Sequence, residues 1–377
     1  MAGLSFVRDW CGNCAWPSLR SLHLLVRLSG VAGAMLFAIA TARACDTLSP
    51  KPIGVILAVG DIMQCDMGDF EKRAPKTAQL IADEIVCLEK MEIPVRVLLL
   101  GDLAYPRGSD EDFKCFTDKW ERIIRDKLKK PDEEILPVPG NHEYLDPTKT
   151  ARGFFKHFAG NAVISAAKER SSQAQVKSGG FGYFSTRFPK GDNSWLLLGL
   201  NGHLPNSESQ AIQYRWLREQ LNSASGQMAR CVLAFWHDPV FSSGKHGHDK
   251  VLPTHHPIRK ERLIHSYTIL YQSGASLVLN GHDHDYEQFK PHNPDGKLAD
   301  DGLRSFVIGT GGNYAPKEQW TRWTDIADGP MEQKVDGVLR LDLFPDSYDW
   351  RFIPVAGTPI SGERLGHGIC NERKPLP

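Results

Sequence analysis

The sequence lacks the global features that would assign a chain to a partner class at once. Its 377 residues carry no net charge, because 45 Lys and Arg residues balance 45 Asp and Glu residues. Overall charge therefore gives no reason to expect binding to nucleic acid or to a membrane surface. The chain also shows no internal repeat, low-complexity tract or clear domain break. Any function has to be sought in local motifs.

The sequence also lacks an apolar run long enough for a comfortable transmembrane helix. Its most apolar N-terminal stretch, residues 28–40, is short, follows several arginines and precedes Ala42-Arg43-Ala44. A basic region, a short apolar run and an Ala-x-Ala site are typical of a secretory signal peptide. We expect residues 1–44 to be that signal and the mature protein to be exported, either periplasmic or secreted. An uncleaved anchor and a lipoprotein modified at Cys45 are the alternatives.

Closely spaced cysteines are missing from the chain beyond residue 44. The wide scatter of the six cysteines there argues against a zinc site of the CxxC type. An even number in an exported protein permits disulfides, but the sequence does not choose among the connectivities. Two of them lie in apolar runs, where we expect buried thiols or bridge partners and not nucleophiles. The six are Cys45, Cys65, Cys87, Cys115, Cys231 and Cys370, and the two in apolar runs are Cys87 and Cys231.

Strand and helix patterns alternate along most of the remaining chain. Short apolar runs predict buried strands, and apolar residues at helical spacing predict amphipathic helices between them. Residues 64–73 are polar and predict a loop, and Pro131 is expected to end the helix before it. The alternating start and the antiparallel pair at the end indicate one α/β domain with layered sheets. The main predicted strands are residues 53–59, 95–100, 135–139, 230–236, 275–279, 335–343 and 348–354, and the first two helices are residues 76–91 and 112–130.

Polar side chains that bind metals follow five of the predicted strands directly. In open α/β sheets, ligand sites gather at the carboxyl ends of the strands. A mixed oxygen and nitrogen set suits iron, manganese or zinc. Six ligands exceed what one catalytic ion needs, so two ions sharing Asp102 fit better, and such pairs activate water for phosphate-ester hydrolysis. The six residues are Asp61, Asp102, Asn141, His237, His282 and His284.

The sequence Asn280-Gly281-His282-Asp283-His284 carries two of these residues. Gly281 is expected to allow a sharp turn where the strand stops. Positions i and i+2 of an extended segment point the same way, so both imidazoles reach one place. We interpret them as one ligand to each of two ions, with the Asp283 side chain pointing away.

Taken together, these blocks resemble the calcineurin-type metallophosphoesterase superfamily, and Tyr105 is similar to the tyrosine of purple acid phosphatases. The resemblance spans roughly residues 53–315 and implies an α/β/β/α sandwich, with residues 45–377 as a single metallophosphoesterase catalytic domain. It implies a hydrolase, a metal-dependent acid phosphatase that hydrolyses phosphate monoesters with a hydroxide activated by two metal ions. The blocks are Gly60-Asp61, Gly101-Asp102-Leu103-Ala104-Tyr105, Gly140-Asn141-His142-Glu143, Trp236-His237 and Gly281-His282-Asp283-His284.

The resemblance also implies a role for each matching residue. The first metal, ferric iron, would be held by Asp61, Asp102, Tyr105 and His284. The second, which is iron, zinc or manganese, would be held by Asp102, Asn141, His237 and His282. A phenolate is a hard anionic ligand that favours a trivalent ion.

Two histidines outside the ligand set are the catalytic candidates. His142 would stabilise the phosphate or protonate the leaving group. Residues 241–248 resemble the same segment of bacterial purple-acid-phosphatase-like proteins, where His246 or His248 would contact substrate, and we take His246 as the candidate. This chain departs from the wider superfamily in having no histidine at position 63, and Pro106 follows Tyr105.

Several alternative interpretations of these motifs remain open. Gly-Asp and Gly-Asn pairs are also ordinary turn dipeptides. Asn201-Gly202-His203 follows another strand, where we expect a bystander, and the glycine-rich run 309–312 is expected to be a plain turn. A phosphodiesterase or nucleotidase on the same scaffold is the nearest alternative, and a non-catalytic metal-binding protein is the third. We expect a small phosphate-ester substrate, no nucleic acid and no stable membrane partner after signal cleavage; the oligomeric state is not predicted.

Overall fold

The computed structural model describes residues 50–377, apart from residues 66–67, 167–181, 245–256, 314–324, 330, 359 and 361–363. The predicted signal at residues 1–44, Cys45 and the candidate residue His246 therefore lie outside the described residues. Within the described ranges, no helix combines the length and apolar character that crossing a membrane requires.

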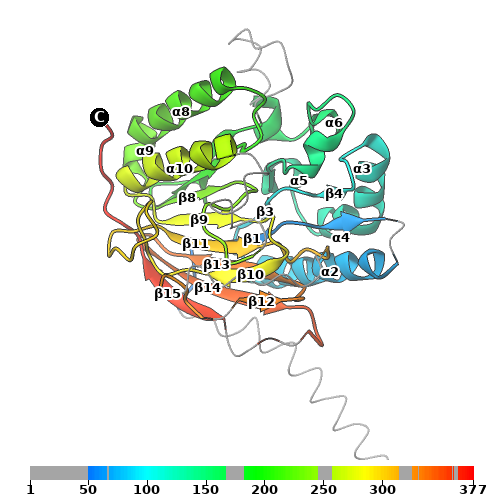
Figure 1. The fold of residues 1–377 in the computed structure, drawn as a ribbon. Coiled ribbons are helices and arrows are strands. Elements are labelled where there is room, and N and C mark those ends of the chain that lie inside the picture. Colours follow the sequence, from blue (N-terminus) through cyan, green and yellow to red (C-terminus); the bar gives the residue numbers. More distant parts are fainter. Residues whose placement is uncertain are drawn as a thin grey trace, which may run out of the picture. The chain divides into compact units, whose positions relative to one another are not determined.

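Two sheets form the centre of residues 51–377 (Figure 1). In the first, three parallel strands, β1, β3 and β5, are joined to an antiparallel group through the pairing of β1 with β13. Every residue of β1 is buried, which accounts for its apolar run. In spatial order the strands are β15 (Leu365–Ile369), β14 (Ser347–Pro354), β13 (Gly337–Leu343), β1 (Gly54–Val59), β3 (Val95–Leu99) and β5 (Ile135–Pro137).

The second sheet has seven strands, and its central four are parallel. β6 pairs antiparallel with β7 at one edge, while β10 and β12 extend the other edge. In spatial order the strands are β12 (Glu332–Gln333), β10 (Asp285–Gln288), β11 (Arg304–Ile308), β9 (Leu277–Asn280), β8 (Val232–Phe235), β7 (Trp195–Gly199) and β6 (Phe184–Phe188).

Aromatic side chains join the facing sides of the two sheets. Trp195 of the second sheet meets Tyr348 of the first with ring centroids 5.8 Å apart. Tyr286 stacks on Phe352 at 4.2 Å. On the outer faces, α2 (Asp69–Lys90) packs against the first sheet, and α8 (Ser207–Asn222) and α10 (Pro257–Gln272) cover the second through a shared apolar core. The expected α/β/β/α arrangement is confirmed.

Short elements fill the connections, and two of them hold the loops after β1 and β3 together. β2 (Met63–Gln64) pairs in parallel with β4 (Ala104–Tyr105), so Gln64 lies beside Tyr105. The others are α3 (Asp110–Phe116), the π-helical η1 (Thr117–Glu121), α4 (Arg122–Arg125), α5 (Pro131–Glu134), the 3-10 helix η2 (His142–Leu145), α6 (Arg152–His157) and α9 (Ala224–Met228).

Two boundary predictions were wrong. Residues 69–73, predicted to be a loop, are the first residues of α2. Arg73 is held in this helix by an ion pair of 2.6 Å with Asp336, which is distant in sequence. Pro131 begins α5 at its first turn and does not end the preceding helix, which has already finished at Arg125. A proline fits the first turn because its missing N–H would have no helical partner there.

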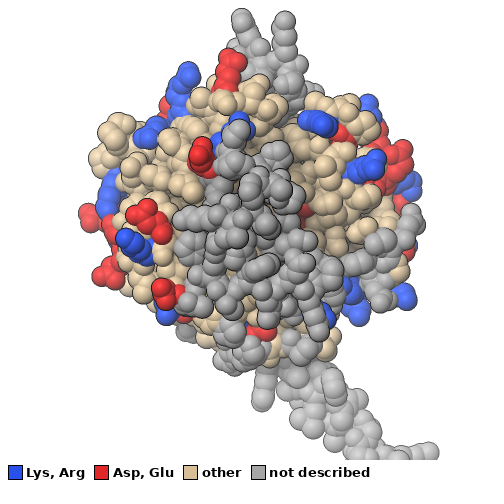
Figure 2. All heavy atoms as spheres, in the orientation of Figure 1, with Lys and Arg blue, Asp and Glu red and all other residues tan. Residues whose placement is uncertain are grey.

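Disulfides join Cys65 to Cys115 and Cys231 to Cys370, and Cys87 is also disulfide-bonded. The interpretation of Cys87 and Cys231 as bridge partners is therefore confirmed. On the face drawn in Figure 2, the basic and acidic side chains of the described residues are interspersed. This distribution agrees with the zero net charge of the sequence.

Candidate metal centre

The predicted ligands meet where strands of both sheets end. Asp61 follows β1 and Asp102 follows β3, in the first sheet, while His237 follows β8 and His282 follows β9, in the second. Parallel strands present their carboxyl ends at one edge, so residues far apart in sequence converge there. The site therefore lies at an edge shared by the two sheets.

Three ligand candidates adopt left-handed backbone conformations. The φ angles are +60° at Asp61, +50° at Asp102 and +74° at His282. Such angles are uncommon for residues with a side chain and are maintained only where the surroundings enforce them. The expectation that Gly281 makes the turn was wrong in this respect, because His282 takes the positive φ. Gly281 is needed for space instead, since a Cβ there would lie 2.6 Å from Oδ2 of Asp61.

One group of side chains surrounds the hydroxyl of Tyr105. The phenol oxygen lies 2.9 Å from Oδ1 of Asp61 and 3.1 Å from Nε2 of His284. The same Asp61 oxygen is 3.2 Å from Nε2 of His284. Oδ2 of Asp61 accepts a hydrogen bond of 2.8 Å from the backbone N–H of His282. This arrangement fixes the direction of the Asp61 carboxylate.

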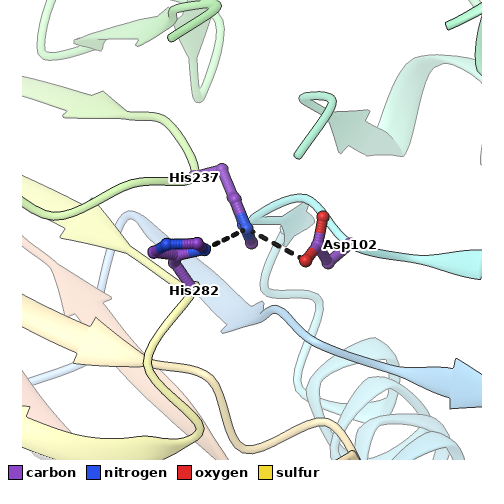
Figure 3. A group of neighbouring side chains, drawn as sticks. All are labelled: Asp102, His237 and His282. Carbon is purple, nitrogen blue, oxygen red and sulfur yellow. Dashed lines mark hydrogen bonds and ion pairs between the residues drawn. The ribbon is translucent and has the colours of Figure 1, made fainter. Parts of the chain in front are cut away.

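A second group surrounds Nε2 of His237 (Figure 3). Oδ1 of Asn141 and Nδ1 of His282 each lie 3.1 Å from this nitrogen. Oδ2 of Asp102 lies 3.2 Å from it. Figure 3 shows the imidazole of His237 reaching between Asp102 and His282.

Asp102 belongs to both groups through one oxygen atom. Its Oδ2 lies 3.1 Å from the Tyr105 hydroxyl and 3.2 Å from Nε2 of His237. Its Oδ1 accepts a hydrogen bond of 2.8 Å from the backbone N–H of His142. One oxygen of Asp102 therefore faces both groups of donors.

The charges at this edge shift several pKa values. Burial acts to raise the pKa of Asp102, but the facing imidazoles, chiefly His237, lower it well below its usual range. Burial acts to lower the pKa of His237, and the negative charge of Asp102 raises it well above the usual value. Burial and the charges of Asp102 and Asp61 raise the pKa of Tyr105. The site therefore favours positive charge, and a phenolate at Tyr105 needs a cation beside it.

The donor set fits metal ions. Asp102, His237 and His282 each offer one atom, and these atoms lie within 4.8 Å of one another; among the described residues, no other set of three or more His, Cys, Asp or Glu side chains does so. Nδ1 of His237 lies 2.8 Å from the carbonyl oxygen of Leu100. A proton held there leaves the lone pair of Nε2 free to face the cluster.

Sequence reasoning missed the contribution of Glu143. Its carboxylate is fully buried and accepts hydrogen bonds from the backbone N–H groups of Gly140 at 2.7 Å, Leu103 at 2.8 Å and Asp102 at 2.9 Å. Burial, with the charge of Asp102, raises the pKa of Glu143 to about 7. It joins the loops that follow β3 and β5. The Gly-Asn-His-Glu sequence contained it, but no local pattern showed what its side chain would contact.

His142 lies at the rim of the site. Its Nδ1 is 2.7 Å from the carbonyl oxygen of Pro106, and its ring centroid is 4.3 Å from that of Tyr105. Its Nε2 is 3.9 Å from Oδ2 of Asp102, and 30% of the side chain is exposed. An imidazole held in this way presents Nε2 to whatever binds at the cluster. The other catalytic candidate, His246, lies outside the described residues.

The glycine-rich run after β11 is a loop with a bend at Gly311 and Gly312. Its N–H groups donate to carbonyl oxygens of the chain: Gly309 to Asp285 at 3.1 Å, Gly311 to Gly60 at 2.9 Å and Asn313 to Asp61 at 3.1 Å. These three amides are therefore occupied by the chain's own backbone. The run instead holds the backbone around Asp61.

Comparisons with known proteins point the same way as the geometry. A sequence model described as calcineurin-like phosphoesterase matches residues 54–286. Purple acid phosphatase 15 of Arabidopsis thaliana is 26% identical over 243 residues, which cover 58% of this chain and 40% of that protein. Purple acid phosphatase 23 of the same plant is 25% identical over 63% of this chain and 50% of its own length. The chain thus spans at most half the length of these two relatives.

A solved structure shares the fold. Purple acid phosphatase PPD1 from yellow lupin, Lupinus luteus, superposes with a TM-score of 0.54 at 15% identity, covering 84% of this chain and 54% of that one. At this level of identity, the likeness concerns the architecture alone.

Proposed function

The chain belongs to the calcineurin-like phosphoesterase family, and from this premise we propose that it is a metal-dependent phosphatase that hydrolyses phosphate monoesters. The observation that carries the proposal is the position of Oδ2 of Asp102, within 3.2 Å of both the Tyr105 hydroxyl and Nε2 of His237. One carboxylate oxygen between two groups of donors is what two neighbouring ions need.

We assign the ligands by these groups. Asp61, Tyr105 and His284, with Asp102, would hold the first ion. Asn141, His237 and His282, with the same Asp102, would hold the second. When bound, the ions would activate a water molecule and neutralise charge on the phosphate.

The remaining steps belong to side chains of the chain. Nδ1–H of His142 donates to the carbonyl oxygen of Pro106 at 2.7 Å. This leaves Nε2 as the nitrogen that would exchange a proton with a phosphate oxygen or a leaving group. The backbone N–H of His282 donates to the Asp61 carboxylate and fixes its direction. Asp61 would thereby hold the first ion close to Asp102. Glu143 would keep the Asp102 backbone in its left-handed conformation.

We further propose that the first ion is ferric iron and that the second is iron, zinc or manganese. The tyrosine supports this choice, because a buried phenol beside two carboxylates loses its proton only to a strong positive charge. The likeness to plant purple acid phosphatases supports it as well. Residues 1–44 would direct export, and residues 45–377 would form the catalytic domain.

A phosphodiesterase or nucleotidase would use the same ligands, so turnover must decide. The purified protein should hydrolyse p-nitrophenyl phosphate with a higher kcat/KM than bis(p-nitrophenyl) phosphate. Faster cleavage of the diester would overturn the monoesterase proposal. Cleavage of neither ester by a protein loaded with metal would favour a non-catalytic metal-binding role.

A further inference from the structure

His203 and Asp238 form a buried pair beside the second group of donors, and the proposed function does not use them. His203 follows β7 and Asp238 follows β8, which are neighbouring parallel strands. Nε2 of His203 contacts Oδ2 of Asp238, and the two side chains are 4% and 6% exposed. Sequence reasoning treated Asn201-Gly202-His203 as a bystander.

The other oxygen of Asp238 faces a ligand histidine. Oδ1 of Asp238 lies 3.8 Å from Nε2 of His282, a charge contact longer than a hydrogen bond. The opposite nitrogen, Nδ1 of His282, lies 3.1 Å from Nε2 of His237, inside the cluster. A negative charge behind Nε2 favours a proton there, which leaves the lone pair of Nδ1 for a metal ion.

The three ligand histidines differ in what contacts the ring nitrogen that faces away from the cluster. Nδ1 of His237 has the carbonyl oxygen of Leu100 at 2.8 Å. Nδ1 of His284 is buried without a hydrogen-bond partner in the part of the chain that the structure describes. Among the described residues, His282 is the one of the three whose nitrogen on the side away from the cluster faces a carboxylate. In the second group, each imidazole therefore has an oxygen atom facing its outer nitrogen: the Leu100 carbonyl at His237 and the Asp238 carboxylate at His282.

His203 is itself held firmly in place. Its backbone N–H donates to Oδ1 of Asn201 at 2.9 Å, and its ring stacks on Tyr144 with centroids 5.7 Å apart. The backbone N–H of Asn201 in turn donates to Oε1 of Gln213 at 2.9 Å. A histidine fixed in this way restricts the rotamer of the Asp238 carboxylate that it contacts.

We propose that His203 and Asp238 are positioning residues for the second metal site. Asp238 sets the tautomer and orientation of His282, and His203 fixes Asp238. The inference rests on the proposed function because it presumes an ion bound by His282. It adds two residues that would support a ligand of the second ion without themselves being ligands.

The test measures metal occupancy of the purified full chain by equilibrium dialysis against zinc-buffered solutions. Asp238→Asn should weaken the second zinc by about 10–100-fold, the range seen when groups behind metal ligands are removed. The first zinc should be retained as in the wild type. His203→Gln should lower the affinity for the second zinc ion by a smaller factor. The double variant should bind this zinc as tightly as Asp238→Asn does, because His203 acts through Asp238.

A second histidine–carboxylate pair, in which the carboxylate is buried and the imidazole half-buried, supplies the control. Nε2 of His157 lies 2.9 Å from Oε2 of Glu121, and the two side chains are 17% and 2% exposed. Among the described residues, the hydrogen bonds and ion pairs of these two side chains involve none of the predicted ligands. Glu121→Gln should lower thermal stability while zinc occupancy stays at the wild-type level. A loss of zinc in this variant equal to that in Asp238→Asn would mean that general destabilisation is the cause, and would overturn the inference.

Nitrogen-15 NMR of the imidazoles in the metal-free full chain gives a readout independent of affinity. His282 should carry its proton on Nε2 in the wild type and shift toward Nδ1 in Asp238→Asn. Unchanged tautomer and unchanged zinc occupancy in that variant would overturn the inference and leave the proposed function standing. A wild-type protein that retains no metal would overturn both.

Discussion

The hydroxyl oxygen of Tyr105 lies 3.1 Å from Nε2 of His284, although 179 positions separate the two residues. β4 carries the tyrosine, and the segment between β9 and β10 carries the histidine. Burial and the charges of Asp102 and Asp61 raise the pKa of the phenol, so without a cation it stays protonated. Tyr105 would therefore become a phenolate only with a cation bound beside it.

The first prediction concerns Tyr105 itself. Tyr105→Phe should abolish the visible charge-transfer band of the iron-loaded protein, because that band needs a phenolate bound to ferric iron. Absorption spectroscopy at matched iron content measures the change. Tyr144→Phe is the control, since this tyrosine is held by Asn201 at 2.7 Å and is not a predicted ligand. A Tyr105→Phe protein that keeps its colour would remove Tyr105 from the ligand set.

The second prediction separates the two histidines of the His-Asp-His sequence. His284→Ala should lose the ion of the first site and keep that of the second, and His282→Ala should do the reverse. The reason is that their facing nitrogens lie against Tyr105 and His237, respectively. Elemental analysis after dialysis measures both metals. Loss of the same single ion in both variants would show that they share one site.

The third prediction concerns the shared carboxylate. Asp102→Asn should lower kcat/KM for p-nitrophenyl phosphate by more than ~100-fold, since it puts an amide NH2 group, which cannot bind a cation, where Oδ2 faces both groups of donors. Circular dichroism should show the fold retained, because the amide oxygen can still accept the His142 N–H. Unchanged hydrolysis would place the activity at another site.

The fourth prediction concerns Glu143. Glu143→Gln should lower the free energy of unfolding by about 1–3 kcal/mol, because the new amide group would face backbone N–H donors that then lack an acceptor. Urea unfolding measures this change. Activity should fall with it, since the loop of Asp102 depends on the same hydrogen bonds. Wild-type stability and activity would show that Glu143 has no such structural role.

The fifth prediction is a pH dependence away from the metal site. Burial lowers the pKa of His292 to about 4, and its Nε2 lies 2.9 Å from the Tyr267 hydroxyl. Below about pH 6.5, His292 takes up a proton in the unfolded chain but stays neutral in the folded protein. The free energy of unfolding is therefore highest above that pH and decreases as the pH falls toward 4. The loss should approach about 3 kcal/mol.

Comparison with His292→Gln isolates this contribution. The variant should be less stable than the wild type at pH 7, and the gap in unfolding free energy should narrow as the pH falls to 4. Urea unfolding at both pH values measures the gap. A gap that stays constant with pH would show that His292 titrates normally in the folded protein.

The strand and helix patterns of the sequence predicted one α/β domain with layered sheets and ligand candidates at the strand ends, and the family resemblance implied the α/β/β/α order. Buried strands must be apolar along their length, so β1, β3, β8 and β9 were visible as short runs. Parallel strands of one sheet end at one edge, so the polar residues after β1, β3 and β5 were expected to lie near one another, as were those after β8 and β9. Those constraints are local or follow from sheet geometry, and a single sequence displays them.

Other features depended on contacts that the sequence does not display. The helical start at residues 69–73 is supported by the ion pair of Arg73 with Asp336, 263 positions away. β15 has an alternating exposed pattern and two glycines, which gave no strand signal, yet it pairs along β14. The partners of the bridging cysteines were likewise open until the chain was folded.

The sequence by itself determined which residue types stand at the strand ends, and therefore which chemistry the site can offer. The family resemblance implied the two ligand groups with Asp102 in common. Only the tertiary structure decided that a single oxygen of Asp102 faces both groups, and that Glu143, Asp238 and His203 contact the ligand residues from outside the cluster. The physical reason is that ligand identity is a property of single residues. Hydrogen-bond partners and facing charges are set by the packing of segments that the sequence separates by tens to hundreds of positions.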